Sequence, residues 1–327
     1  MATIDDIVRV SGVSRSTVFR FLSGRNVRPD AKRAIIDVME QLNYKTDMLV
    51  KQQQITMEIS ISESFESYSV FAQMLQGITT RADAKGIKVH LVRRTGAQIT
   101  EDYQNWHVEG ENKGVIVIGK TMQDEEMETK LLVEHGIPHI YINRMFEDDG
   151  VSCVSVEFKK VAYEMVSYLI QKGNTLIGTC GNPKKHRVER DKLEAYRQAL
   201  KDHGLPLSSL YYRELEHDED MDDVMRDILT QTPRPTAYFT LCDSHAMKLL
   251  SIAQALGIKV PKELEVASID DIEAAAFLKP TLTTMHIPFR KIGSMAVDAL
   301  MQLITDRDLA CVRQTVHHEM VIRDSTI

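Results

Sequence analysis

Residues 3–22 read TIDDIVRVSGVSRSTVFRFL, and this stretch decides the fold of the amino-terminal part of the chain. Its first half places isoleucine and valine at helical spacing behind a Thr-x-x-Asp capping sequence, which predicts a helix over residues 4–10. Gly12 then permits the left-handed backbone of a tight turn. A second helix is predicted from Ser14 to Leu22. Two short helices joined by a glycine turn are typical of a helix-turn-helix unit.

A third helix is predicted from about Pro29 to Leu42, because proline is favoured in a first helical turn and the apolar residues that follow share one face. In such a three-helix head the second helix can enter the DNA major groove. Arg15, Ser16 and Arg20 lie on the outer faces of that helix. Arginine can bond guanine bidentately and serine can bond a base edge or a phosphate, so these residues are candidate DNA contacts. The alternative for each arginine is a solvated surface charge.

The net charge is divided unevenly along the chain. Residues 1–51 contain nine Lys or Arg and six Asp or Glu, a net charge of +3, and because the whole chain carries −7, the remainder carries −10. A cationic module on an acidic body is expected when only the module meets phosphate groups. The pattern therefore predicts double-stranded DNA as the partner of the head alone.

The stretch that follows the head has the composition of a linker. Residues Lys45 to Gln54 are polar and contain few β-branched residues, which is typical of a segment that can become helical. We therefore divide the chain into a DNA-binding head (1–45), a hinge (46–56) and a body (57–327).

In the body, strand-like runs alternate with amphipathic helical runs, and the alternation occurs twice. The expected strands are 57–61, 88–92, 114–118, 139–142, 154–156, 176–180, 237–241 and 266–269, and the expected helices are 71–84, 127–134, 160–171, 192–202 and 244–256. This order predicts an α/β fold with two doubly wound parallel-sheet lobes and a cleft between them.

In open α/β sheets a ligand binds outside the carboxyl ends of the strands. Several cationic residues follow strand-like runs and are therefore expected at the cleft: Lys120, Arg144, Arg187, Arg190 and Lys192. A cluster of this sign suits a phosphorylated or carboxylated effector.

This sequence lacks the motifs that are typical of enzymes and of metal-binding proteins. It contains no GxxxxGK[ST], no GxGxxG after a strand and no GxSxG, and a helix carrying both His135 and His139 would be broken by Gly136 and Pro138. We expect no enzymatic activity, no cofactor and no metal site. The cysteines are widely spaced without a CxxC pair and are expected to be buried free thiols: Cys153, Cys180, Cys242 and Cys311.

The acidic start MATIDDIVRV is unlike a signal peptide, and no apolar run reaches membrane-spanning length. We therefore expect a cytoplasmic protein that does not bind membranes. The main alternative with two similar lobes is an exported solute-binding protein, which needs neither the head nor DNA.

Motifs along nearly the whole chain resemble those of the lactose-repressor/galactose-repressor (LacI/GalR) family. The head sequence Gly-Val-Ser-Arg-Ser-Thr-Val at 12–18 is followed by Arg20, Leu22, Val27 and Leu42-Asn43-Tyr44 at the family's spacing. The matching runs of the body are Pro235-Thr236-Ala237, Cys242-Asp243-x-x-Ala246, Gly257-x-x-Val260-Pro261, Ser268-Ile269-Asp270-Asp271, Pro280-Thr281-Leu282-Thr283-Thr284 and Val321–Thr326. Their order along the chain carries the resemblance.

For the head, the resemblance implies that Arg15, Ser16 and Arg20 read bases and that the serine-rich turn binds phosphates. The implied DNA contacts are Thr3, Ser14, Arg15, Ser16, Thr17, Arg20, Asn26, Tyr44, Leu49 and Gln53. Phe19 stands where the family usually has serine. In the hinge, Gln53 occupies the position of the family's minor-groove leucine, and Leu49 or Met48 can replace it only in a shifted register. Insertion into the minor groove and a plain flexible linker remain the two alternatives.

For the body, the resemblance implies a periplasmic-binding-protein-like arrangement, with lobes at about 57–155 with 287–320 and about 156–286. It also implies a repressor that binds its operator as a homodimer and a sugar or sugar phosphate in the cleft. The implied effector contacts are Phe71, Arg144, Arg190, Lys192, Phe239, Asp243 and Asp270. Val70 is the alternative to Phe71, and either Arg190 or Lys192 is expected to clamp the effector. Alternatively, the two aspartates cap helices and Phe71 belongs to the core.

Overall fold

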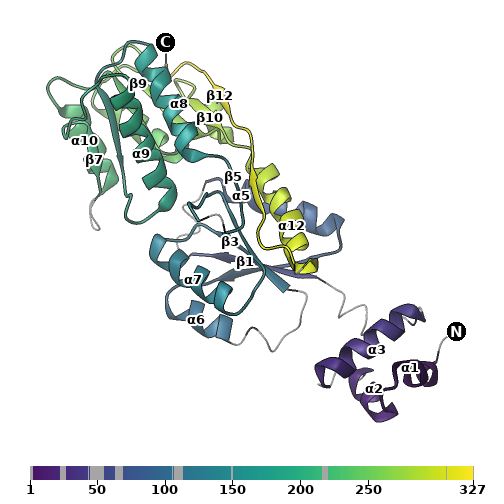
Figure 1. The fold of residues 1–327 in the computed structure, drawn as a ribbon. Helices are drawn as coiled ribbons and strands as arrows, with labels where there is room; N and C mark the ends of the chain where they lie inside the picture. The colour runs from purple at the N-terminus through teal and green to yellow at the C-terminus, as the bar shows by residue number, and fades with distance from the viewer. Residues whose placement is uncertain are drawn as a thin grey trace.

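The structure is a computed structural model, shown in Figure 1. It describes residues 3–22, 27–42, 44, 55–62, 69–104, 106, 113–148, 150–215, 220–306 and 308–326. Among the predicted DNA contacts, Asn26, Leu49 and Gln53 lie outside the described residues, as does nearly all of the predicted hinge.

The head consists of α1 (Ile4–Ser11), α2 (Arg15–Leu22) and α3 (Pro29–Gln41), within a residue or two of the predicted helices. The capping box forms as predicted, because the Thr3 Oγ1 accepts from the Asp6 backbone N–H at 3.3 Å and the Asp6 carboxylate accepts from the Thr3 N–H at 2.9 Å. Gly12 ends α1 with a φ of 67°. The helices enclose one small core of Ile7, Val18, Phe21, Ile35, Val38 and Met39.

The body contains two six-stranded sheets, which confirms the predicted doubly wound α/β class. The first has the order β11-β5-β4-β3-β1-β2 and is parallel throughout. Its strands are β1 (Thr56–Ile61), β2 (Lys88–Arg93), β3 (Lys113–Ile118), β4 (His139–Ile142), β5 (Cys153–Ser155) and β11 (Arg313–Thr315).

The second sheet has the order β12-β10-β9-β8-β6-β7 and is parallel except for the edge pair of β10 and β12. Its strands are β6 (Ile177–Gly181), β7 (Tyr212–Glu214), β8 (Ala237–Phe239), β9 (Glu265–Asp270), β10 (Thr283–His286) and β12 (Glu319–Val321). Every residue of β6, β8 and β9 is buried, as expected of parallel strands covered on both faces.

Helices cover both faces of each sheet (Figure 1). On the first sheet, α5 (Phe71–Ala84) and α12 (Phe289–Thr305) cover one face, and α6 (Ala97–Gln104) and α7 (Met122–Glu134) the other. On the second, α8 (Phe158–Gln171) and α9 (Arg187–Asp202) lie opposite α10 (Met221–Thr230) and α11 (Asp243–Ala255), and a short 3-10 turn, η3, spans Glu273–Ala276. Among the described residues, every helix is too short or too polar to cross a lipid bilayer.

The chain passes between the two sheets three times, after β5, after β10 and after β11. The segment that follows β10 returns to the first lobe and contributes α12 and β11 to it. It also contains β12, which pairs with β10 in the second sheet. The last crossing lies between Thr315 and Glu319, and the predicted end of this segment is at about residue 320.

Candidate functional site

A pocket of about 250 Å³ lies between the two lobes, at the carboxyl ends of the strands of both sheets. The first lobe contributes the start of α5 (Ser69, Val70, Met74), the turn after β3 (Ile118, Gly119, Lys120) and the turn after β4 (Asn143, Arg144). The second lobe contributes residues 185–189 and Lys192 around the start of α9, Leu241 and Cys242 after β8, His245 of α11 and Asp270 at the end of β9. This is the position expected for a ligand of two parallel sheets.

The pocket wall is rich in cations. Of the five cationic residues predicted from strand ends, Lys120, Arg144, Arg187 and Lys192 line the pocket. Arg190, the fifth, does not line it, and its Nε lies 3.8 Å from the Asp191 carboxylate and 3.9 Å from that of Glu194. Of the two alternatives, Arg190 and Lys192, only Lys192 lines the pocket.

One buried carboxylate, that of Glu125 on α7, holds two of these cations. Its Oε1 accepts from the Nε of Arg187 at 2.6 Å, and its Oε2 accepts from the guanidinium of Arg144. The Arg187 guanidinium also lies over the Phe146 ring, 4.8 Å from its centre. Glu125 and Arg144 belong to the first lobe and Arg187 to the second, so this ion-pair group links the lobes across the pocket.

Lys120 and Lys192 are almost fully buried beside the pocket. The Lys120 Nζ donates to the backbone oxygens of Ile61 and Arg94 at 3.0 and 2.6 Å and lies 3.2 Å from Glu128. Burial lowers the pKa of this ammonium. The Lys192 Nζ donates to the backbone oxygen of Leu241 at 2.6 Å. Both lysines therefore also fix strand ends.

Three buried polar atoms on the pocket wall have no hydrogen-bond partner within the described residues: Asn143 Oδ1, Arg144 Nε and His245 Nδ1. Buried polar atoms in proteins are nearly always paired with protein or solvent. Asn143 also takes a left-handed backbone with a φ of 62°, which is costly for a residue other than glycine. These atoms are therefore unsatisfied polar groups in the wall of the pocket.

The two predicted effector aspartates differ. Asp270 lines the pocket, whereas Asp243 is fully buried outside it and accepts from Thr284 Oγ1 at 2.6 Å and from the Ile272 backbone N–H at 2.9 Å. With its oxygens occupied in this way, Asp243 joins α11 to β10 and to the loop after β9, and its predicted place in the pocket is wrong.

The aromatic predictions also need correction. Phe239 and Phe71 are buried in the main hydrophobic core and do not line the pocket. Phe239 lies on a β8 position that faces α8 and α9, so its ring packs inside the second lobe. Val70, the alternative to Phe71, does line the pocket. The role of the lining residues in effector binding remains a prediction.

Asp270 should give the protein a distinctive pH dependence. Burial raises the pKa of its carboxyl to about 8, against the lowering effect of Lys192, with Asp243 adding to the rise. The folded state then holds a proton that the unfolded state, with an aspartate pKa of about 4, has lost, so stability falls as pH rises from about 4 to 8. Relative to wild type, Asp270→Asn should gain melting temperature between pH 5 and pH 8, with no further gain above pH 8. Parallel melting curves over this range would contradict the assignment.

In the head, the described candidate residues lie around the exposed face of α2. Arg15, Ser16 and Arg20 are exposed, and Ser14 directly precedes the helix, with its Oγ 2.7 Å from Thr17 Oγ1 and 3.1 Å from Ser16 Oγ. Arg15 makes an exposed ion pair with Asp5 at 3.2 Å, which contributes little in water and leaves the arginine free to exchange partners.

The two other described candidates of the head have structural roles. Thr3 caps α1, and Tyr44 is half-buried against the core of the head. Whether any of these residues touches DNA remains a prediction.

Sequence reasoning missed Glu125, His186 and Glu189. Glu125 stands in the polar run Met122–Glu128, which resembles a solvated helix surface, and only its two arginine partners reveal its burial. His186 and Glu189 precede the first apolar repeat of α9. Burial and the neighbouring Lys185 and Arg144 lower the pKa of His186 to about 4, so its ring is neutral at pH 7. The signal that could have found them is their position just after β6.

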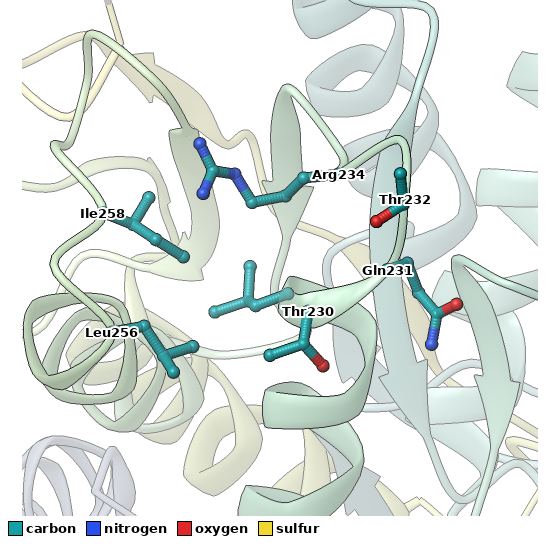
Figure 2. Close-up of a pocket in the computed structure, with 7 residues that line it drawn as sticks. Thr230, Gln231, Thr232, Arg234, Leu256 and Ile258 are labelled. Atoms are coloured by element: carbon teal, nitrogen blue, oxygen red, sulfur yellow. The ribbon is translucent and has the colours of Figure 1, made fainter.

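A second pocket, of about 400 Å³, is shown in Figure 2. Leu256 and Ile258 lie on one side of it and Thr230, Gln231 and Thr232 on the other, and its one charged side chain, Arg234, donates to Glu263 at 3.1 Å. These loops precede β8 and β9, so this pocket lies at the amino ends of the strands, away from the cationic cleft.

Among the described residues, no group of three or more His, Cys, Asp or Glu side chains is arranged to hold a metal. Cys153 and Cys180 are buried as predicted, whereas Cys242 and Cys311 are partly exposed.

Together, the head and the two-lobed body define a ligand-binding protein with a helix-turn-helix reader. Residues 3–47 match the family described as bacterial regulatory proteins, lacI family, and residues 166–326 match the periplasmic binding protein-like domain. The amino-terminal domain therefore belongs to the lacI family of bacterial regulatory proteins, and the chain is a DNA-binding transcriptional regulator controlled by a small-molecule effector.

Named relatives cover the chain from end to end. The transcriptional repressor PurR of Vibrio vulnificus is 25% identical over 99% of this chain and 98% of its own length, and catabolite control protein A of Staphylococcus epidermidis is 25% identical over 99% of both. The probable repressor ExuR of Bacillus subtilis is 25% identical over 99% of this chain and 98% of its own.

Solved structures agree in fold. The complex of the regulator CelR with cellobiose has a TM-score of 0.74 at 22% identity, covering 99% of this chain and 100% of that one. The lac repressor dimer bound to operator and an anti-inducer has a TM-score of 0.72 at 21% identity, covering 100% and 99%.

Proposed function

We propose that the effector is an anionic carbohydrate, a sugar phosphate or a sugar acid, and that its binding in the cleft changes the affinity of a homodimer for a pseudo-palindromic operator. The homodimer follows from the size of the reader, because one short helix contacts too few base pairs for useful specificity. The lac repressor structure named above is likewise a dimer on its operator. A protein that acts on DNA in a bacterium works in the cytoplasm.

The observation that carries the proposal is the shared carboxylate of Glu125. Two guanidinium groups, those of Arg144 and Arg187, have one carboxylate between them, which leaves one positive charge uncompensated at the pocket. The other charged residues at the pocket are Lys120, Lys185 and Lys192, against Glu128, Glu189 and Asp270, so together they add no net negative charge. An anionic group entering the pocket completes the charge balance, and arginine forks suit phosphate and carboxylate geometry.

The carbohydrate part of the proposal rests on the polar groups around that charge. Asn143 Oδ1 and His245 Nδ1 lack partners among the described residues, and hydroxyl groups of a sugar can satisfy them. The CelR complex named above holds cellobiose, a sugar. The relatives PurR and ExuR are named as transcriptional repressors, which supports binding without catalysis.

The coupling to DNA follows from the position of Arg187. Because its bond to Glu125 joins the two lobes, an anion that also binds Arg187 changes how the lobes are held together. The effector can shift the arrangement of the lobes only by its differential affinity for the two states.

Calorimetric titration of the full-length protein tests the proposal, using glucose against glucose 6-phosphate and galactose against galacturonate, and extending to other such pairs. We expect the anionic member of one pair to bind at least tenfold more tightly than its neutral partner. Arg187→Met should abolish that advantage. The control is Arg213→Met, which removes a half-exposed arginine paired with Asp227 at 2.9 Å outside the cleft. Neutral sugars that bind as tightly as their anionic partners would refute the proposal.

A further inference from the structure

The exposed face of α2 carries an apolar side chain at its centre. Consecutive residues of an α-helix are about 100° apart, and Val18 and Phe21 face the core of the head. The opposite face therefore carries, in order around the helix, Arg15, Phe19, Ser16 and Arg20. Phe19 lies between Arg15 and Ser16. Phe19 is 48% exposed.

Phe19 has polar neighbours on this face, and one of them contacts its ring. The Arg15 guanidinium lies 5.8 Å from the ring centre, within the range of a cation–π contact. In this position the ring supports the side chain of Arg15. Single exposed apolar residues are common on protein surfaces, so the argument depends on which surface this is.

This surface is the one that a helix-turn-helix protein inserts into the major groove. A phenylalanine ring has no donor or acceptor and cannot form the phosphate or base hydrogen bond available to a serine at this position. The apolar group that B-DNA presents in the major groove is the C5 methyl of thymine. A ring in the middle of the reading face therefore has one suitable partner.

We propose that Phe19 is a specificity-determining residue that recognises a thymine, packing its ring against the C5 methyl group in each half-site while Arg15 remains stacked on the ring. The contact buries one methyl group per half-site. Loss of that methyl should weaken binding about fourfold per half-site, and about 15-fold for an operator with two half-sites.

Selection from a random pool of duplexes by the full-length protein gives the binding site, and substitution of deoxyuridine for thymidine then tests the contact. Deoxyuridine retains base pairing and lacks only the C5 methyl. For the wild type, we expect one thymine at a fixed place in each half-site whose replacement weakens binding about 15-fold when both half-sites are changed. Deoxyuridine at thymines elsewhere in the site should have little effect.

Two variants complete the test. Phe19→Ser should bind thymine and deoxyuridine sites equally, whereas Phe19→Leu, which keeps an apolar side chain, should retain part of the discrimination. Since Phe19 is outside the core, both variants should melt at the wild-type temperature, and if Phe19→Ser loses all DNA binding, Phe19→Leu provides the comparison. A wild-type protein indifferent to deoxyuridine at every thymine, or a Phe19→Ser variant that discriminates as the wild type does, overturns the proposal.

Discussion

A Gly77→Ala variant should lose about 3 kcal/mol of folding free energy, near the upper end of overpacking effects. A Cβ at Gly77 on α5 would lie 2.0 Å from the backbone oxygen of Arg290 in α12. The contact is reciprocal, because a Cβ at Gly293 on α12 would lie 2.3 Å from the Met74 oxygen on α5. Backbone atoms cannot rotate away as side chains can, so the two helices would have to separate.

The measurement is urea unfolding followed by circular dichroism, with Thr80→Ala as the control because Thr80 is exposed on the same helix. The control should stay within about 0.5 kcal/mol of wild type. Since Val70 and Met74 border the cleft at the start of α5, Gly77→Ala should also weaken effector binding. An unfolding midpoint equal to that of wild type would show that the helices are not in backbone contact.

Much of this fold follows from local sequence patterns. The apolar repeat of residues 71–84 predicts α5 with its observed bounds, and the capping sequence before Ile4 places the start of α1. The starts of other helices are predicted too late. The sequence predicts α9 from residue 192, whereas the helix begins at Arg187. The prediction misses the first turn because that turn is polar and faces the pocket. Periodicity detects burial in a core, and a helix start that lines a cleft lacks that signal.

The site was less predictable than the fold. Strand ends correctly locate Lys120, Arg144 and Arg187 at the cleft, because topology brings the carboxyl ends of parallel strands together. Asp243 also follows a strand, yet Thr284, which is distant in sequence, turns it into a structural residue. Glu125 is the reverse case, since arginines from two other segments turn a residue of a polar helix into a buried link between the two lobes beside the cleft. Long-range partners decide both roles, and local sequence does not show them.

Arg20→Ala should weaken operator binding about 5- to 150-fold per half-site and leave effector affinity unchanged. Arg20 is exposed on the reading face of α2, and a bidentate arginine–guanine pair contributes about 1–3 kcal/mol of discrimination. The matched control is Arg9→Ala, which removes the same charge from α1, where the side chain is 76% exposed and paired with Asp6 at 2.6 Å.

Salt dependence separates the two roles that Arg20 can have on DNA. If it reads a base, the variant loses affinity for the preferred site far more than for random duplex, and it tolerates substitutions at one position of each half-site. If it only contacts a phosphate, affinity falls by a similar factor on every sequence and the slope of log affinity against log salt drops by about one per contact. Fluorescence anisotropy on both duplexes across a salt series measures this. Equal affinity of Arg20→Ala and Arg9→Ala for the preferred site would remove Arg20 from the base-reading residues, and with it the expectation that the exposed face of α2 determines which operator is bound.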